Sequence, residues 1–297
     1  MKNYIRISSY QGPLADGQVG KNIKKVKEVL SEQAGRGADF LCFPEAFLTG
    51  YSPEAIRFAA LMPEDPRLKE LIAFTKPYDT VLLVGLSERT GEEFHNVQLV
   101  IYRGQLLGKQ EKTMLTRGYD DQYFKTRLEF PVFDVKGVRF GVCICHSTSF
   151  VEPALLLRLK GARLLFTPHF NSIHPQMRLP DGSEVTFADH RSMVLANQAG
   201  LAALLKMVVV RSNIVQIDRE SLGCGDSNMW DMDGQLVAAG KPFTECVVTH
   251  DFPLDIFQRE HPMIDRREVP AELYRMITDE AALYLQDTPF PYPYAAH

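Results

Sequence analysis

Long apolar runs are missing from this sequence of 297 residues. No stretch approaches the roughly 18 consecutive apolar residues that a membrane-spanning helix requires. The N-terminal segment from Met1 to Arg6 also lacks the apolar region of a secretory signal. We therefore expect a cytoplasmic protein that has no membrane partner.

A strong excess of either charge is also missing. The 33 lysine and arginine residues are nearly balanced by 37 acidic residues, which gives a net charge of -4, and no block of basic residues interrupts the mixture. Proteins that bind nucleic acid as their main partner usually carry a basic patch or stripe. Nucleic acid is therefore not an expected partner.

Cysteines are few and odd in number. The five are Cys42, Cys143, Cys145, Cys224 and Cys246, a set that does not indicate a disulfide framework in a chain of this length. The closest pair, Cys143 and Cys145, lacks the C-x-x-C spacing of redox and zinc sites, and the histidines form no H-E-x-x-H motif. We predict reduced thiols and no bound metal.

The sequence does contain the mixture that is typical of a folded globular protein. Hydrophobic residues make up 45% and charged residues 24% of the chain, which excludes the disordered, collagen-like and coiled-coil classes. Apolar strand patterns alternate with amphipathic helix patterns along the chain. The strands are expected at residues 5–10, 39–43, 80–87, 96–102, 138–145, 163–167, 207–212, 228–230, 236–239 and 246–250, and the helices at 19–34, 66–76, 151–160, 186–206 and 271–285.

No linker rich in proline, glycine or serine divides this alternation. We therefore predict a single α/β domain over residues 1–286. The tail, residues 287–297, contains Pro289, Pro291 and Pro293 and cannot form a helix. It is either an extended arm or a disordered end.

Two residues follow predicted strands, at the edge of an α/β sheet where functional side chains converge. Glu45 comes after strand 39–43, and Cys145 ends strand 138–145 before a polar stretch. Nearby backbone N–H groups and the start of a helix are expected to favour the thiolate of Cys145. The alternatives are an ordinary salt bridge for Glu45 and a small core position for Cys145.

Three segments, taken in order, resemble the nitrilase superfamily of carbon–nitrogen hydrolases. Phe43–Glu45 with Leu48–Tyr51 is similar to the first-glutamate motif of that family, and Glu111–Leu115 is similar to its lysine motif. Gly141–Cys145 followed by Phe150–Glu152 is similar to its nucleophile motif. One such motif would be weak evidence, but their shared order argues against chance convergence.

The resemblance implies a four-layer αββα sandwich that dimerises and a Glu–Lys–Cys site that uses no metal or organic cofactor. In such a site Glu45 would accept the thiol proton of Cys145, which would attack an amide carbonyl. Lys112 and the backbone N–H of His146 would stabilise the oxyanion, and water would hydrolyse the thioester. The segment 150–160 is too apolar for a single helix stripe, which also favours a homodimer or higher homo-oligomer.

The second glutamate of the family has no counterpart in this chain. The segment Tyr119–Phe124 carries aspartates in its place. Asp120 or Asp121 would then position Lys112 and the substrate, and Asp121 is the one we select as a site residue. A solvated turn is the alternative, because aspartate is common in turns.

The neighbours of the nucleophile suggest further substrate contacts. His146 and Ser147 stand where the family usually has an aromatic residue and a carboxylate, which disfavours nitrile hydrolysis. His146 would contact the substrate, or else be a structural histidine bonded to a carbonyl. His169 and Asn171 follow the next strand, where the family places substrate-facing residues. Tyr51 would form an aromatic wall, although aromatic residues more often belong to the core.

These expectations combine into an enzyme that cleaves a small linear amide or carbamoyl compound to an acid and ammonia or an amine. Its expected partner is therefore a small-molecule amide. Two alternatives stay open. An acyltransferase would use an amine or alcohol in place of water, and a non-catalytic small-molecule binder would account for the unusual His146–Ser147 pair.

Overall fold

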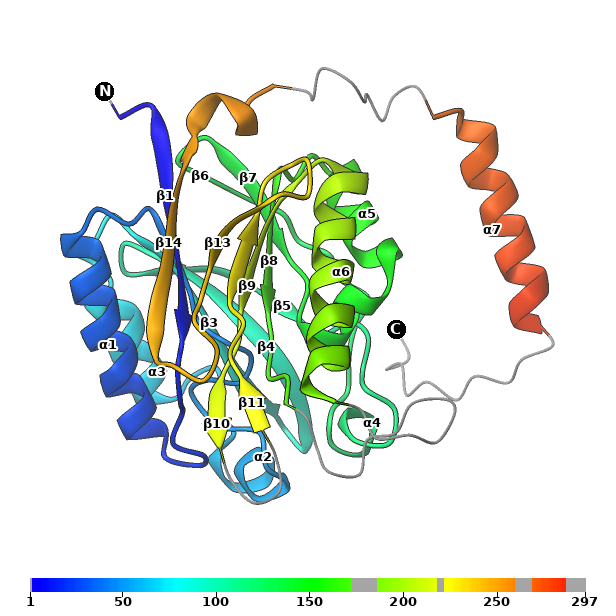
Figure 1. Cartoon of the computed structure of the whole chain (residues 1–297). Helices are drawn as coiled ribbons and strands as arrows, with labels where there is room; N and C mark the ends of the chain where they lie inside the picture. The colour runs from blue at the N-terminus through cyan, green and yellow to red at the C-terminus, as the bar shows by residue number, and fades with distance from the viewer. Residues whose placement is uncertain (1, 173–185, 218–221, 260–268, 287–297) are drawn as a thin grey trace.

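One mixed six-stranded sheet combines strands from the first 111 residues with β14, a strand from the last fifth of the chain. The computed structural model describes residues 2–172, 186–217, 222–259 and 269–286 (Figure 1). The strand order of the first sheet is β14-β1-β2-β3-β4-β5, in which β1, β2 and β3 run parallel and the other pairs are antiparallel. The strands are β14 (Cys246–Pro253), β1 (Tyr4–Gln11), β2 (Phe40–Cys42), β3 (Val81–Thr90), β4 (Glu93–Tyr102) and β5 (Gln105–Glu111).

A second six-stranded sheet repeats this plan. Its order is β13-β12-β9-β8-β7-β6, and again the three strands β7, β8 and β9 run parallel between antiparallel edges. The strands are β13 (Leu236–Ala239), β12 (Asn228–Trp230), β9 (Val208–Ser212), β8 (Leu164–Pro168), β7 (Val138–Val142) and β6 (Phe133–Val135). A separate two-stranded ribbon pairs β10 (Val215–Ile217) with β11 (Leu222–Cys224).

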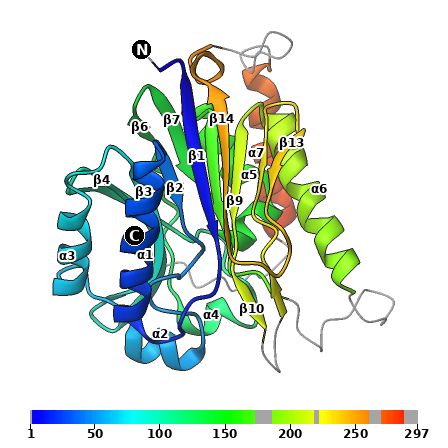
Figure 2. The ribbon, with the colours of Figure 1, turned by 60° about the vertical axis from the view of Figure 1, so that its left-hand side comes forward.

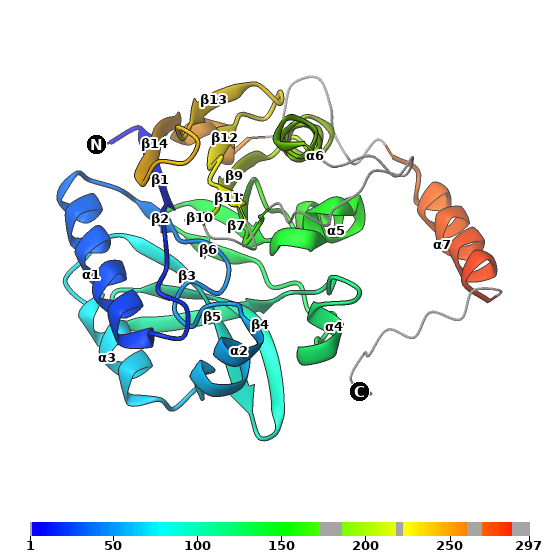
Figure 3. The ribbon, with the colours of Figure 1, turned by 60° about the horizontal axis from the view of Figure 1, so that its bottom comes forward.

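Helices cover the outer face of each sheet, so the protein is a four-layer αββα sandwich, as the resemblance implied (Figures 2 and 3). The helices α1 (Val19–Gly35) and α3 (Pro66–Phe74) bury an apolar face on the first sheet. The helices α5 (Val151–Leu159) and α6 (Phe187–Leu205) bury theirs on the second. A third apolar layer fills the space between the two sheets.

The sequence pattern explains these layers. On α1, Ile23, Val26 and Leu30 recur at helical spacing and all three are buried. The parallel strands are buried on both faces and therefore consist of near-continuous apolar runs, such as Phe40–Cys42 and Leu164–Pro168. Burial on both faces is what gives the strands before Glu45 and Cys145 their apolar character.

Most of the expected elements are present, with shifted ends. The strand before Cys145 ends at Val142, because its pairing with β8 stops at Phe166 and the chain then enters a 3-10 turn, η1 (Cys145–Ser149). Elements that the sequence reading missed are strands β5, β6, β10 and β11, and the short helices α2 (Pro53–Ala59), α4 (Asp120–Tyr123) and η2 (Leu254–Phe257).

The C-terminal helix, α7 (Ala271–Gln286), lies apart from the four layers (Figures 1 and 3). Within the described residues, no helix has the length and apolar character needed to cross a membrane. The predicted tail at 287–297 lies outside the described residues, and the domain boundary at residue 286 stays a prediction.

Candidate active site

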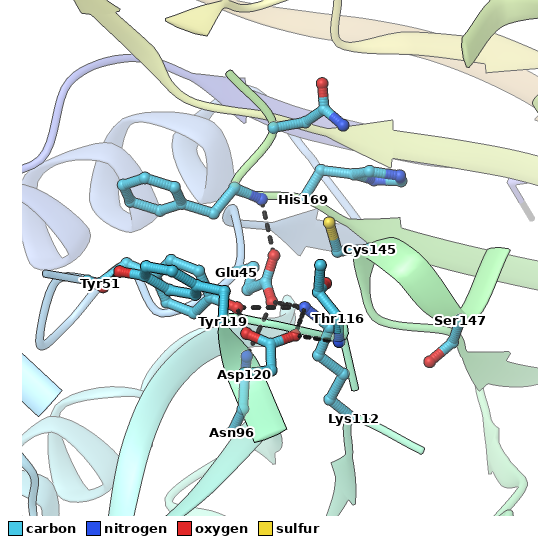
Figure 4. A network of polar contacts seen from close by, with 12 residues as sticks. Glu45, Tyr51, Asn96, Lys112, Thr116, Tyr119, Asp120, Cys145, Ser147 and His169 are labelled. Atoms are coloured by element: carbon cyan, nitrogen blue, oxygen red, sulfur yellow. Dashed lines mark hydrogen bonds and ion pairs between the residues drawn. The ribbon is translucent and has the colours of Figure 1, made fainter. Parts of the chain in front are cut away.

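The carboxyl ends of β2, β5 and β7 meet at one edge of the sandwich. Glu45 follows β2, Lys112 follows β5 and Cys145 follows β7. Figure 4 shows the three side chains beside one another, with Tyr51 and Asp120 completing a polar cluster around Lys112. The structure therefore brings together the three residues that the sequence separated by long intervals.

The turn after β2 holds Glu45 in the interior. Ala46 has a left-handed backbone with φ of 51°, and the turn packs so closely on β3 that a Cβ at Gly85 would come within 2.4 Å of the Ala46 nitrogen. Only glycine fits at that point of β3. The Glu45 side chain is 0% exposed as a result.

Three donors compensate the buried Glu45 carboxylate. Oε1 accepts hydrogen bonds from Asn96 Nδ2 at 2.7 Å and from Lys112 Nζ at 2.8 Å. Oε2 accepts one from the backbone N–H of Phe170 at 2.7 Å. Bonds to a charged acceptor are stronger than neutral ones, so this set offsets the cost of removing the carboxylate from water.

Lys112 is a buried ammonium with every N–H engaged. Its Nζ lies 2.8 Å from Glu45 Oε1, 2.7 Å from Asp120 Oδ2 and 3.1 Å from the Tyr51 hydroxyl. Burial alone would lower the pKa of Lys112, but the carboxylates of Glu45 and Asp120 outweigh it and hold that pKa well above its usual value. The site therefore keeps a permanent positive charge between two acids.

The carboxylate that contacts Lys112 is Asp120 and not Asp121, the residue that we selected. Asp120 is fully buried, and it also accepts hydrogen bonds from Tyr51 Oη and from Thr116 N at 2.8 Å. Asp121 instead accepts from Gly118 N at 2.9 Å, within the turn. Successive residues of the short helix α4 point about 100° apart, so only one of the two aspartates can face the lysine.

The pKa of Asp120 shows the influence of its partners. Burial raises this pKa, but Lys112 and the hydrogen bonds from Tyr51 and Thr116 lower it by more than burial raises it. The net pKa of Asp120 therefore lies below the usual value. Tyr51, the residue expected to form an aromatic wall, thus also makes polar contacts through its hydroxyl with Asp120 and Lys112. Its ring stacks on Phe170 with centroids 4.9 Å apart.

Cys145 is the half-buried member of the group. Its backbone is left-handed, with φ of 46°. Burial and, to a smaller extent, the Glu45 carboxylate raise the pKa of the Cys145 thiol to about 12, and Lys112 only partly opposes them. The thiolate is not favoured as expected, because burial and Glu45 outweigh the backbone N–H of Phe170, which lowers this pKa, and because the helix α5 starts only at Val151. The resting sulfur is a thiol that needs a base.

Ser147 joins the turn after β7 to the segment after Lys112. Its hydroxyl oxygen accepts hydrogen bonds from Met114 N at 3.1 Å and from Thr113 Oγ1 at 3.3 Å. His146 is half-buried and packs edge-on against Phe150, and burial together with Lys112 lowers its pKa below the usual value. His146 is therefore neutral at neutral pH.

His169 is buried beside the turn η1, which we call the nucleophile turn, with its Nε2 3.4 Å from Thr148 Oγ1. It is 3% exposed, and its Nδ1 donates to the Thr167 carbonyl at 2.7 Å. Asn171 is half-buried, and its main chain is held by Asn213. Its side-chain oxygen is buried and has no hydrogen-bond partner among the described residues, so it is the better placed of the two to receive a ligand.

Sequence reasoning missed Asn96 and the backbone N–H of Phe170. Asn96 is a buried amide in β4, and a polar residue in a strand is a detectable signal. The Phe170 contact is made by the main chain, so no residue type could have indicated it. Within the described residues, no group of histidine, cysteine, aspartate and glutamate side chains is arranged to hold a metal ion.

Comparisons with known proteins identify the family and the fold. The sequence profile of the carbon–nitrogen hydrolase family matches residues 6–259. The chain is 32% identical over 239 residues to the "hydrolase in pqqF 5′ region" of Pseudomonas protegens, covering 79% of this chain and 78% of that protein. It is 30% identical over 274 residues to a glutamine-dependent NAD(+) synthetase of Thermotoga maritima, with 89% of this chain but only 45% of the synthetase covered.

A solved structure has the same fold. An amidase from Nesterenkonia sp. superposes with a TM-score of 0.76 at 17% identity, covering 93% of this chain and 98% of that chain. At this level of identity the likeness concerns the fold.

Proposed function

Because the chain belongs to the carbon–nitrogen hydrolase family, we propose that it hydrolyses a small linear amide or carbamoyl compound through a thioester on Cys145. The products are an acid and ammonia or an amine. The observation that carries the proposal is the buried array of Glu45, Lys112 and Asp120 beside a half-buried protonated thiol. The fold shared with a known amidase supports it.

The first step forms the thioester. The Glu45 carboxylate takes the thiol proton while the sulfur of Cys145 bonds to the carbonyl carbon and the C=O electron pair moves onto oxygen. When the tetrahedral intermediate collapses, the C–N bond breaks and Glu45 returns the proton to the leaving nitrogen. A thiol with a raised pKa makes this transfer to Glu45 necessary.

The oxyanion is stabilised by Lys112 and by the backbone N–H of His146. All three N–H groups of Lys112 are already bonded, so the oxyanion has to share or replace one of those bonds. The bond to the Tyr51 hydroxyl is the longest, at 3.1 Å, and its acceptor is neutral. We expect it to be the bond that yields.

The second step releases the acid. Glu45 removes a proton from water, the water oxygen attacks the thioester carbon, and the C–S bond breaks as the proton passes to the departing sulfur. This restores the thiol and the carboxylate. An amine or alcohol in the place of water would give acyl transfer, so products formed with added amines distinguish the two reactions.

Mass spectrometry tests the proposal directly. A panel of linear amides and carbamoyl compounds, incubated with the protein, should release ammonia and give an acyl adduct on Cys145. The Cys145→Ala variant should show neither. An intact protein that forms no adduct and releases no ammonia with any member of the panel would support the non-catalytic binder instead.

We also propose that the protein forms a homodimer or higher homo-oligomer through α5 and α6. The outer faces of these helices expose large apolar side chains, namely Val151, Leu156, Leu159, Met193 and Leu204. Sedimentation should show an oligomer at micromolar concentration, and Leu159→Glu should weaken it. A wild-type protein that sediments only as a monomer would contradict this.

A further inference from the structure

Cys145 holds a backbone conformation that needs support. A left-handed φ of 46° is unfavourable for a residue with a Cβ, and it persists only where neighbouring groups fix it. The turn η1 contains only five residues, and no side chain caps its start. Support therefore has to come from hydrogen bonds made by side chains of the turn and of the elements packed against it.

A chain of three buried polar side chains provides such a support. Thr148 Oγ1 donates to the carbonyl oxygen of Cys145 at 2.8 Å and accepts from Gln198 Nε2 at 3.1 Å. The Gln198 oxygen in turn accepts from Thr167 Oγ1 at 2.9 Å. Exposed fractions are 6% for Thr148, 1% for Gln198 and 0% for Thr167. The nucleophile turn is thus tied to both α6 and β8.

Thr148 has one hydroxyl hydrogen and two acceptors within reach. The Cys145 carbonyl lies at 2.8 Å, whereas His169 Nε2 lies at 3.4 Å. Gln198 approaches the Thr148 oxygen through its amide nitrogen, which can only donate. The shorter distance assigns the hydrogen to Cys145, and Gln198 fixes the direction in which the hydroxyl points.

The carbonyl that Thr148 holds belongs to the peptide whose N–H is that of His146. A peptide unit is planar, and in the trans form its C=O and N–H point in opposite directions. A bond that fixes the Cys145 oxygen therefore also aims the His146 N–H to the opposite side. The same planar unit contains the Cys145 Cα, from which the side chain with the sulfur extends.

We propose that Thr148, held in place by Gln198, is a positioning residue that orients the Cys145–His146 peptide and with it both the nucleophile and the oxyanion-binding N–H. The inference rests on the proposed function, because it assigns Thr148 a role only if Cys145 is acylated. A buried threonine here has a task that an apolar residue of the same size cannot perform.

The test compares three single variants. Thr148→Val keeps the volume and removes the hydroxyl, and Thr148→Ser keeps the hydroxyl. Thr80→Val is the matched control, because Thr80 is also buried, at 1% exposed, and donates to a backbone carbonyl, that of Ala38, at 2.7 Å. Thr80 stands at the opposite end of the parallel strands, before β3.

We expect Thr148→Val to lower kcat about tenfold with less than about a twofold change in KM, because the lost orientation matters mainly in the transition state. Thr148→Ser should recover most of the rate, and Thr80→Val should lose thermal stability but keep its kcat. A Thr148→Val variant that matches Thr80→Val in kcat would overturn the inference. So would an effect confined to KM.

A double-mutant cycle tests whether Gln198 acts through Thr148. Gln198→Met should lower kcat by itself, and Thr148→Val with Gln198→Met should be no slower than Thr148→Val alone. Additive losses would overturn the link. The two proposals fail separately. Wild-type protein without an acyl adduct on Cys145 refutes the function, whereas a wild-type adduct that Thr148→Val forms at the rate of Thr80→Val refutes only the positioning role.

Discussion

The turn after β2 and the turn after β7 have similar backbone geometry, but the first carries a charged side chain and the second a neutral one. Each places a left-handed residue that is not glycine at the site, Ala46 in one and Cys145 in the other. The first turn buries a carboxylate and gives it three donors. The second leaves a half-buried sulfur whose thiol pKa is raised to about 12. The site therefore carries its charged groups beside the first sheet, and under the proposed function its nucleophile stays neutral until substrate binds.

Removing the sulfur should have the largest effect. Cys145→Ala is expected to lower kcat by at least about 10⁴-fold, because no other group can form the thioester. Ammonia release from the best amide substrate measures it. Cys143→Ala is the matched control, since Cys143 is buried against α5 and α6 and should tolerate the change with its activity retained. Comparable losses in both variants would mean that packing, not the thioester, limits the rate.

Neutralising Glu45 should have opposite effects on catalysis and on the reactivity of the Cys145 thiol. Glu45→Gln is expected to lower kcat by roughly 100-fold or more, because the thiol loses its proton acceptor. The same change should speed alkylation of Cys145 by iodoacetamide at pH 9. The negative charge of Glu45 raises the thiol pKa, so its removal lowers that pKa and increases the thiolate fraction. Slower alkylation in the variant would contradict this electrostatic account.

The two aspartates of α4 should differ in their importance. Asp120→Asn removes one charged partner of Lys112 and is expected to lower kcat by roughly 10- to 100-fold. Asp121→Asn changes only a turn contact and should stay within about twofold of wild type. Steady-state kinetics of both variants on one substrate decide the matter. Equal losses of kcat in the two variants would contradict the conclusion that Asp120 is the more important aspartate.

The smallest effect is expected where the second turn meets the lysine segment. Ser147→Ala leaves the Met114 N–H without its acceptor and should cost about 1 kcal/mol of stability, with a loss in kcat of no more than about threefold. Ser87→Ala is the control, because Ser87 is buried too but its hydroxyl has no partner among the described residues. Denaturant unfolding of both variants measures the difference, and equal stabilities would count against the Ser147 contact.

Most of the fold could be predicted because the layers of the sandwich require recognisable patterns of apolar residues in the sequence. The buried parallel strands and the stripe on α1 are of this kind. The edge strand β5 was not predicted because its first residues, from Gln105 onward, are exposed and do not alternate between apolar and polar side chains. The short elements α2 and α4 escaped because seven and four residues carry too little periodicity.

The site was only partly predictable for a different reason. Glu45 and Cys145 are marked by the strands before them, whereas Lys112 was recognised only through a motif. The choice between Asp120 and Asp121 depends on the rotation of a single helical turn, which sequence does not specify. The contact from Phe170 N crosses 125 residues and uses no side chain at its donor end.

The saturated ammonium of Lys112 has a consequence for turnover. Two carboxylates flank one cation, so the formal balance of Glu45, Lys112 and Asp120 is negative before any molecule enters. An amide arrives electrically neutral, whereas the acid formed from it becomes an anion once it has lost its proton to water. Repulsion from the same two acids should therefore hasten its escape and leave the enzyme weakly inhibited by what it makes.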